Sequence, residues 1–292
     1  MESEAAYPSK PADRVRPSWA ISQAVPVLAK AGVASPRVDA ELLAAYVLGV
    51  PRSRLALSPG FSREQFAEFS RLVSLRATRV PLQHLTGTAP FRHLELAVGP
   101  GVFVPRPETE LLVDWVLSVL PRPSATVVDL CAGSGAIALS VATEAPGSTV
   151  YAVESSSAAL SWLRRNASAY PGIEVVSGSV LDPVLLSTLD GQVDVVVSNP
   201  PYVPSGSAVP AEVSEHDPAE AVFGGPDGLA VIRPVVSVAA RLLRPGGWLG
   251  IEHDDSHGVV VPDLLRASGV FETVEDHRDL AGLPRFVTAQ RT

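Results

Sequence analysis

The sequence lacks the features of a secreted or membrane-bound protein. It has a single cysteine, Cys131, so no internal disulfide can form, which fits a reducing compartment. No apolar run approaches the ~20 residues that cross a bilayer, and the N-terminus has no apolar segment of a secretory signal. The net charge of −8 disfavours non-specific binding to nucleic acid. We therefore expect a cytoplasmic protein with neither a membrane nor nucleic acid as a direct partner.

The chain divides into four parts by composition and pattern. Its 292 residues are enough for one large domain or two modest ones. We expect a flexible, proline-containing tail over residues 1–17, a helical domain over 18–85, a hairpin linker over 86–107 and a catalytic domain over 108–292. Apolar residues at helical spacing indicate three helices in the second part, which begin near Ser18, Ser35-Pro36 and Ser62.

The third part has a strand-like pattern. Phe91–Val98 alternates between apolar and polar residues, and Val102–Val104 is a second short apolar run. Between them lies Gly99-Pro100-Gly101, whose residue types favour a turn. We therefore expect a hairpin with its turn at these three residues.

In the fourth part, apolar strand-like runs alternate with helical patterns. The expected strands are Thr126–Leu130, Thr149–Glu154, Ile173–Ser177, Val193–Ser198, Trp248–His253, Phe271–Asp276 and Arg285–Gln290. The expected helices are Thr109–Leu120, Ala136–Thr143, Ser157–Ala169 and Leu229–Leu242. This alternation predicts a parallel sheet with helices on both faces. The last two strands have no room for a crossover helix between them, so they should pair antiparallel.

The most informative motif is Asn199-Pro200-Pro201-Tyr202, directly after the apolar strand Val193–Ser198. Neither proline has an N–H for a strand ladder, so the strand ends there. The turn then presents an amide, a carbonyl and an aromatic ring at the strand's carboxyl end. This set is suited to holding a planar NH2 group so that its nitrogen can attack an electrophile.

A second motif, Gly133-Ser134-Gly135, lies between an expected strand and an expected helix. Glycine allows a ligand to approach the backbone, and the helix start offers free N–H groups. Glu154 ends the next strand, at the place where doubly wound nucleotide folds bind a ribose diol. The alternative is a tight turn with a surface carboxylate. If the first and fourth strands are neighbours, both motifs share one crevice at the carboxyl edge of the sheet.

These motifs resemble those of the class I S-adenosylmethionine-dependent methyltransferases. Within that class the chain is similar, over nearly its whole length, to the HemK/PrmC family of protein-glutamine methyltransferases. The residues that carry the resemblance are Pro81–Gly87, Val104-Pro105-Arg106-Pro107-Glu108-Thr109-Glu110, Asp129–Ala138, Ser198–Val203, Glu215–Pro218 and Gly224–Leu229.

The resemblance implies a Rossmann-like α/β fold: a seven-stranded sheet with its last strand antiparallel, and a small all-helical N-terminal domain joined by a β-hairpin. It implies methyl transfer from S-adenosylmethionine, with S-adenosylhomocysteine as product, to the glutamine of the Gly-Gly-Gln motif in peptide chain release factors. The implied cofactor-binding residues are Asp129, Cys131, Ala132, Gly133, Ser134, Gly135, Glu154, Ser179, Val180 and Asn199. The implied catalytic residues are Asn199, Pro200 and Tyr202, and the substrate site adds Pro201, Phe103, Arg106 and Glu252.

Three cofactor positions depart from the family pattern. Ser179 replaces an Asp that recognises adenine in many relatives, and Asp182 is the nearest carboxylate that could substitute for it. Glu154 replaces a commoner Asp, and Cys131 replaces a Gly. No His lies near Cys131 in sequence, so we expect this residue to belong to the cofactor loop and not to act as a nucleophile.

Other functions remain open at the level of sequence. The same chemistry could act on a ribosomal-protein glutamine, or on the exocyclic amino group of a nucleic-acid base, although the acidic charge disfavours the latter. A binding module without activity is a further alternative. The segment His253–His257 has metal-ligating residue types but no strong zinc spacing. We expect no metal and a monomer.

Overall fold

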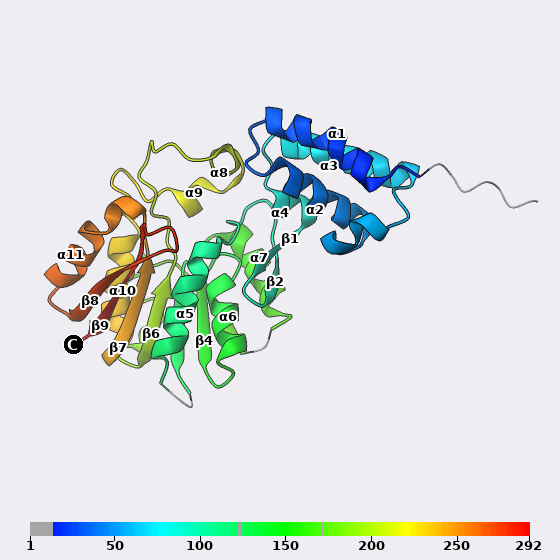
Figure 1. Cartoon of the computed structure of the whole chain (residues 1–292). Coiled ribbons are helices and arrows are strands. Elements are labelled where there is room, and N and C mark those ends of the chain that lie inside the picture. The colour runs from blue at the N-terminus through cyan, green and yellow to red at the C-terminus, as the bar shows by residue number, and fades with distance from the viewer. Residues whose placement is uncertain (1–13, 122–123, 171) are drawn as a thin grey trace, which may run out of the picture. The chain divides into compact units, whose positions relative to one another are not determined.

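The computed structural model describes residues 14–121, 124–170 and 172–292. It divides into two units, Met1–Thr86 and Gly87–Thr292, whose elements are labelled in Figure 1. Most of the predicted tail, residues 1–13, lies outside the described residues. No helix in the described ranges is both long and apolar enough to span a bilayer.

The first unit is helical, and all three predicted helices are present. Its helices are α1 (Pro17–Lys30), α2 (Pro36–Leu48), α3 (Arg63–Ala77), the short α4 (Leu82–Thr86) and a 3-10 turn, Arg52–Leu57. Pro17 and Pro36 occupy the first helical position, where a missing N–H costs nothing. Ser62 and Gln65 form a reciprocal capping box at the start of α3. A small core that includes Leu28, Leu43 and Phe69 holds this unit together.

The second unit begins with a hairpin whose turn differs from the predicted one. Strands β1 (Thr88–Phe91) and β2 (Leu94–Ala97) pair antiparallel around Arg92-His93. Arg92 has a left-handed φ of 51°; its N–H donates to Glu110 and its guanidinium pairs with Glu144. A turn does lie at Gly99-Pro100-Gly101, where the Val102 N–H donates to the Gly99 carbonyl at 3.3 Å, but the expectation that it joins the two strands of the hairpin is wrong.

Those glycines have a different role, close packing against the helix α7 (Ser157–Ala167). A Cβ on Gly99 would lie 2.5 Å from the Trp162 ring, and one on Gly101 would lie 2.8 Å from Ala158. The Trp162 indole also donates to the Pro100 carbonyl at 3.2 Å. Side-chain contacts distant in sequence thus decide where the hairpin turns.

A seven-stranded sheet of order β5-β4-β3-β6-β7-β9-β8 forms the centre of the second unit. Its strands are β3 (Thr126–Leu130), β4 (Thr149–Glu154), β5 (Ile173–Ser177), β6 (Val193–Ser198), β7 (Leu243–Glu252), β8 (Phe271–Arg278) and β9 (Pro284–Arg291). The last strand, β9, pairs antiparallel with both of its neighbours, as predicted. Strands β3 and β6 are adjacent and parallel, which confirms the expectation that the two motifs follow neighbouring strands.

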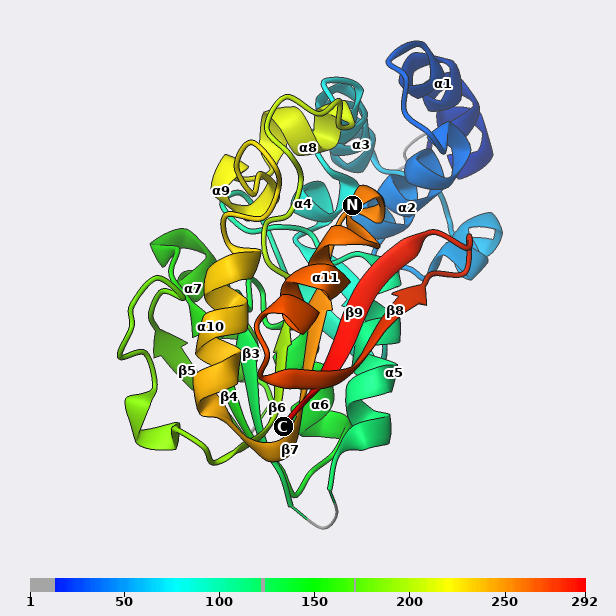
Figure 2. The same ribbon diagram turned by 90° about the vertical axis from the view of Figure 1, so that its left-hand side faces the viewer.

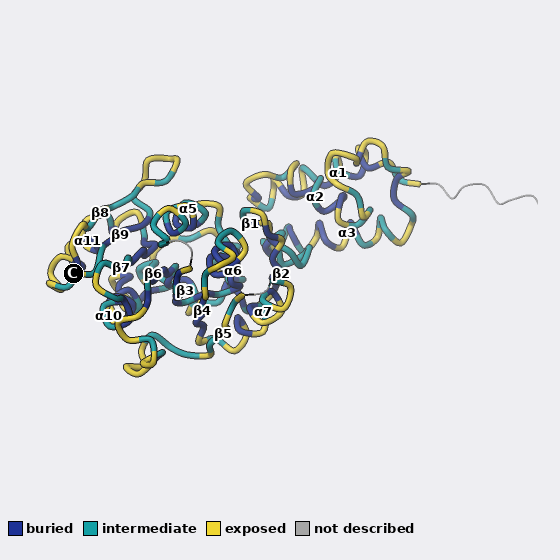
Figure 3. Tube along the Cα trace, turned by 90° about the horizontal axis from the view of Figure 1, so that it is seen from below, coloured by how far each residue is buried: buried dark blue, intermediate teal, exposed yellow. Residues whose placement is uncertain are grey.

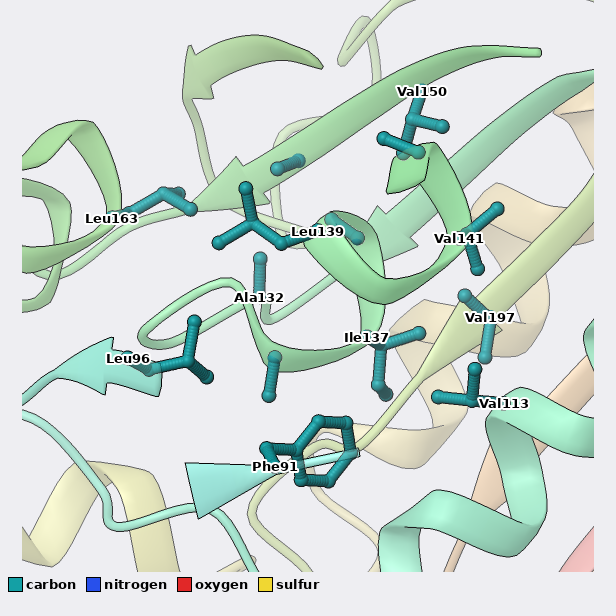
Figure 4. Close-up of a cluster of buried hydrophobic side chains, with 14 of the residues drawn as sticks. Phe91, Leu96, Val113, Ala132, Ile137, Leu139, Val141, Val150, Leu163 and Val197 are labelled. Carbon is teal, nitrogen blue, oxygen red and sulfur yellow. The ribbon is translucent and has the colours of Figure 1, made fainter. Parts of the chain in front are cut away.

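Both faces of the sheet are buried, which explains the continuous apolar runs in its central strands. Two consecutive residues of β3, Val127 and Val128, belong to cores on opposite faces of the sheet. Figures 2 and 3 show the layers, with α5 (Glu110–Val119) and α6 (Ala136–Glu144) on one face and α10 (Ile232–Leu242) on the other. The hairpin completes the first of these cores, where Phe91 lies beside Ile137 (Figure 4).

Three helices of this unit are absent from the sequence-based prediction: α8 (Ala211–His216), α9 (Ala219–Val222) and α11 (Val260–Ala267). The first two have six and four residues, too short for a helical period to be recognised. Helix α11 buries Val261 and Leu265 in the core of the second face.

Candidate active site

The strand register brings the candidate residues to one edge of the sheet. Leu130 of β3 lies opposite Ser198 of β6, and Ser198 lies opposite Ile251 of β7. On the other side of β3, Leu130 lies opposite Val153 of β4. The residues that directly follow this row are Glu154, Cys131, Asn199 and Glu252. Four candidate residues from four strands therefore leave the sheet side by side at its carboxyl edge.

The glycine turn after β3 has the conformation that its sequence predicts. Cys131, Gly133 and Gly135 have φ values of 63°, 56° and 90°, a region that favours glycine. A Cβ on Gly135 would lie 2.7 Å from Leu163, so this glycine allows close packing. A Cβ on Gly133 would meet nothing within 4 Å, so the turn faces open space there. Gly133 thus offers room for a ligand against the backbone.

Glu154 holds this turn through main-chain hydrogen bonds. Its Oε2 accepts the Gly133 N–H at 2.9 Å, while its Oε1 accepts the N–H groups of Ser155 and Ser156 at 2.8 and 2.7 Å. The carboxylate is buried, and a carboxylate has about four acceptor sites. Three of them are therefore committed to the backbone, and the remaining one lies on Oε2.

Asp129, the last-but-one residue of β3, is buried beside the turn. Its Oδ2 accepts the Ala138 N–H at 3.0 Å, while its Oδ1 accepts no hydrogen bond within the described part of the chain. Burial raises the pKa of this carboxyl to about 8, and the charge of Glu154 acts in the same direction. Burial therefore favours the neutral form of this carboxyl.

Cys131 does not have the properties of a nucleophile. Desolvation by the surrounding chain raises the pKa of its thiol to about 12, and the charge of Glu154 adds to the effect. The thiol is therefore neutral at physiological pH. This agrees with its expected place in the turn after β3.

The Asn199-Pro200-Pro201-Tyr202 turn is fixed at both of its ends. The Asn199 amide Nδ2 donates to the Thr109 hydroxyl at 3.1 Å. The Tyr202 hydroxyl donates to Glu252 Oε1 at 3.0 Å. Both partners are buried side chains from other segments of the chain. The sequence analysis did not single out Thr109, although this residue belongs to the motif that carries the resemblance.

A second loop, residues 222–228, packs against the Asn199–Tyr202 turn and bonds to the residue after it. The N–H of Val203 donates to the Val222 carbonyl at 3.0 Å, and the N–H of Gly224 donates to the Val203 carbonyl at 2.9 Å. A Cβ on Gly224 would lie 2.6 Å from the Pro201 carbonyl oxygen. Two glycines, Gly224 and Gly228, therefore permit backbone-to-backbone packing here. In the sequence, the repeated glycine in Gly224–Leu229 is the only sign of this close packing.

Glu252 is a buried carboxylate with one unused oxygen. It is 1% exposed, and its Oε2 has no hydrogen-bond partner among the described residues. Burial raises the pKa of its carboxyl, and the nearby hydroxyls of Thr109 and Tyr202 and the charge of Arg285 oppose this. Burial together with Glu252 also raises the pKa of Tyr202 well above its ordinary value, so the phenol stays protonated.

Phe103 and Arg106 form a separate group with a residue that was not predicted. The Arg106 guanidinium lies 4.8 Å from the centre of the Phe103 ring and donates to Asp217 Oδ2 at 3.1 Å. Burial raises the pKa of Asp217 to about 6, against the opposing charge of Arg106. Asp217 lies in the Glu215–Pro218 segment that contributes to the resemblance.

Ser179 and Val180 follow β5 in the loop next to Glu154, whose carbonyl accepts the Gly178 N–H at 3.0 Å. The Ser179 hydroxyl accepts the Leu181 N–H at 3.2 Å, and Asp182 accepts the Val184 N–H at 3.0 Å. Both side chains thus cap their own loop. This loop leaves the sheet at the carboxyl end of β5, which pairs with β4.

The His253–His257 segment has structural roles. The His253 ring lies between the Asp254 carbonyl and the Asp276 carboxylate, at 2.9 and 3.0 Å. His257 contacts the Asp227 carbonyl at 3.0 Å. In the described ranges, no group of three His, Cys, Asp or Glu residues could hold a metal ion.

A sheet of this order with a glycine turn after β3 and an acidic residue at the end of β4 defines a class I methyltransferase. Solved structures share the fold: the hMettl16 catalytic domain has a TM-score of 0.53 at 15% identity and covers 79% of this chain and 81% of that one. A methyltransferase from Pyrococcus furiosus has a TM-score of 0.51 at 18% identity and covers 79% and 98%.

Sequence comparison identifies the family. Residues 20–87 match the PrmC N-terminal domain, and residues 93–216 match the methyltransferase small domain. The release factor glutamine methyltransferase of Mycolicibacterium smegmatis is 54% identical over 93% of this chain and 96% of its own length. The corresponding enzyme of Streptomyces coelicolor is 48% identical over 93% and 96%. The chain therefore belongs to the release factor glutamine methyltransferase family, as the motifs predicted.

Proposed function

We propose that this enzyme transfers a methyl group from S-adenosylmethionine to the side-chain amide nitrogen of the glutamine in the Gly-Gly-Gln motif of peptide chain release factors. The names of its relatives support the class of substrate. The observation that carries the chemistry is the placement of Asn199, whose Nδ2 is bound to Thr109. This arrangement leaves the amide oxygen Oδ1 as an acceptor for a substrate NH2 group.

The residues on the β3 side fit the proposed cofactor. Gly133 is open to a ligand, the buried Asp129 Oδ1 lacks a partner within the described residues, and Glu154 Oε2 retains one acceptor site for a ribose hydroxyl. We assign cofactor binding to the residues given above, Asp129, Cys131–Gly135, Glu154, Ser179, Val180 and Asn199. When bound, S-adenosylmethionine supplies an electrophilic methyl group that already carries its leaving group.

On the β6 side, the turn positions the substrate amide. Asn199 Oδ1 and the Pro200 carbonyl each accept one N–H, so the NH2 group is held with its nitrogen lone pair free. The same two oxygens oppose the positive charge that develops on the nitrogen during attack. The Tyr202 ring packs against the amide, with its hydroxyl anchored on Glu252.

The site needs no general base before attack. An N-methylated cationic amide is a strong acid and loses its proton to water afterwards. The Tyr202 phenol is held protonated by its raised pKa, which is consistent with an orienting role and not a basic one. We assign Phe103, Arg106 and Glu252, with Pro201, to the walls of the substrate site.

The decisive experiment measures methyl transfer from labelled S-adenosylmethionine to four acceptors offered side by side. These are a release factor, the same factor with its Gly-Gly-Gln glutamine changed to alanine, total ribosomal protein, and DNA. We expect label on the intact release factor alone. Label on ribosomal protein or DNA would keep the chemistry but contradict the proposed substrate. The cytoplasmic location and the monomeric state stay predictions, which fractionation and sedimentation would test.

A further inference from the structure

The orientation of the Asn199 amide is the least constrained element of the proposed site if it is considered alone. An asparagine side chain has an acceptor at one corner and a donor at the other, and rotation by about 180° exchanges them. Only one orientation accepts a substrate N–H; the other places two donors against each other. Some other group must therefore select the orientation.

Thr109 is the group in contact with this amide. Its Oγ1 lies 3.1 Å from Asn199 Nδ2, and the residue is 3% exposed. It ends the 3-10 turn Pro107–Thr109, directly before α5. Helix α5 packs in the core of the second unit, so the position of Thr109 is set by that core.

A hydroxyl alone would not select the orientation, since it both donates and accepts. The selection requires that the hydroxyl proton be directed elsewhere. Glu252 offers the acceptor: its strand is paired with the strand that ends just before Asn199, and its buried Oε2 has no hydrogen-bond partner among the described residues. With its proton directed toward this carboxylate, Thr109 can only accept from Asn199.

We propose that Thr109 is a positioning residue for methyl transfer: its hydroxyl, oriented by Glu252, holds Asn199 with Nδ2 turned away from the substrate and Oδ1 turned toward it. This inference rests on the proposed function, because it assumes that Asn199 accepts the substrate amide. It gives a role in orienting Asn199 to Thr109, in the Arg106–Glu110 segment, and to Glu252, at the end of β7.

The test is a double-mutant cycle in the full-length enzyme with release factor as substrate. Thr109→Val removes the hydroxyl at almost constant volume, and we expect kcat/KM to fall about tenfold, the effect of one lost hydrogen bond. In an Asn199→Ala background, Thr109→Val should cause no further fall in kcat/KM. Thr109→Ser should restore turnover, and the Kd for S-adenosylmethionine should stay unchanged in both Thr109 variants.

Thr288→Val is the matched control, because Thr288 is also buried and its hydroxyl also contacts one side chain, the His277 ring, at 2.7 Å. This control should lose stability without the selective loss of kcat/KM. An equal loss for Thr109→Val in both backgrounds would indicate a structural role and overturn the inference. If Asn199→Ala abolishes turnover while Thr109→Val is fully active, only the inference fails. If Asn199→Ala is itself active, the proposed role of Asn199 fails with it.

Discussion

The two halves of the carboxyl edge of the sheet are held by different kinds of hydrogen bond. On the β4 side, Glu154 accepts three main-chain N–H groups and so fixes the turn around Gly133. On the β7 side, Glu252 accepts the Tyr202 hydroxyl, and one of its buried oxygens has no partner among the described residues. Three of the roughly four acceptor sites of Glu154 are taken by main-chain N–H groups, whereas Glu252 is bound by a side chain distant in sequence.

This difference predicts two kinds of failure. A change on the cofactor side should disturb the backbone and weaken cofactor binding. A change on the acceptor side should leave the fold and cofactor binding intact and reduce turnover, because the hydrogen bonds there orient the substrate.

The sharpest test of this separation is Asn199→Ala. The substitution removes the acceptor for the substrate N–H and for the charge that develops on nitrogen. We expect kcat to fall by ~10²-fold or more, as for the loss of other transition-state contacts. Equilibrium dialysis with S-adenosylmethionine should show a much smaller effect on affinity, because Asn199 is only one of the residues assigned to the cofactor. A variant that turns over normally would contradict the role of Asn199, and one that no longer binds cofactor would contradict the separation of the halves.

A second test breaks the support of the acceptor side without touching a polar group. In Gly224→Ala, the new Cβ would lie 2.6 Å from the Pro201 carbonyl and 2.5 Å from the Gly228 carbonyl. We expect a stability loss of about 1–3 kcal/mol and, because the turn must shift, a turnover loss of about tenfold beyond it.

Gly247→Ala is its matched control. Its Cβ would lie 2.9 Å from the Arg244 carbonyl and 3.0 Å from the Val193 carbonyl, at the start of β6 and not at the end that carries the turn. Thermal unfolding should show both variants destabilised, but only Gly224→Ala should lose turnover at a temperature where both are folded. Equal turnover in the two variants would mean that the 222–228 loop does not set the position of the catalytic turn.

The cofactor side is tested by Glu154→Gln. An amide NH2 in place of one oxygen would oppose either the Gly133 N–H or the Ser155 and Ser156 N–H groups. We expect the affinity for S-adenosylmethionine to fall about tenfold, equivalent to about 1.4 kcal/mol. Glu174→Gln, an exposed carboxylate on the neighbouring strand β5, should bind normally. If Glu154→Gln lowered kcat but not affinity, the two halves would not be separable in this way.

The same contrast explains what could be predicted from sequence. The positions of the strands, the antiparallel β9 and the glycine turn were all predictable, because periodicity and turn residues are local signals. The register of the strands in the structure then places Cys131, Asn199 and Glu252 at one edge.

The remaining features depend on contacts between distant segments. Thr109 lies 90 residues from Asn199, and Asp217 lies 111 residues from Arg106. The hairpin was placed wrongly for the same reason: the position of its turn is set by Arg92, whose partner Glu144 is 52 residues away. No local pattern encodes such pairs, although the family-like motifs contained Thr109, Asp217 and Gly224.

The smallest expected effect concerns the Arg106–Asp217 pair at the edge of the acceptor side. The Asp217 side chain is 1% exposed, and burial raises its pKa from 3.8 to about 6. Between these values the native state keeps a proton that the unfolded state has lost. The contribution of Asp217 to stability therefore falls as the pH rises from 3.8 to about 6. Activity should change in the opposite direction, because only the carboxylate pairs with Arg106.

Asp217→Asn isolates this titration. Below about pH 6 the wild-type enzyme should show a KM for release factor that rises several-fold as the pair with Arg106 is lost, an effect about the size of a partly exposed ion pair. The variant should show the higher KM at all pH values and no such transition. Asp263→Asn, an exposed aspartate paired with Arg266, should behave like wild type. A wild-type KM that does not change across this pH range would show that Arg106 positions the substrate without Asp217. The hydrogen-bonded side chains that support the acceptor side would then be only Thr109, Asn199, Tyr202 and Glu252 among those considered.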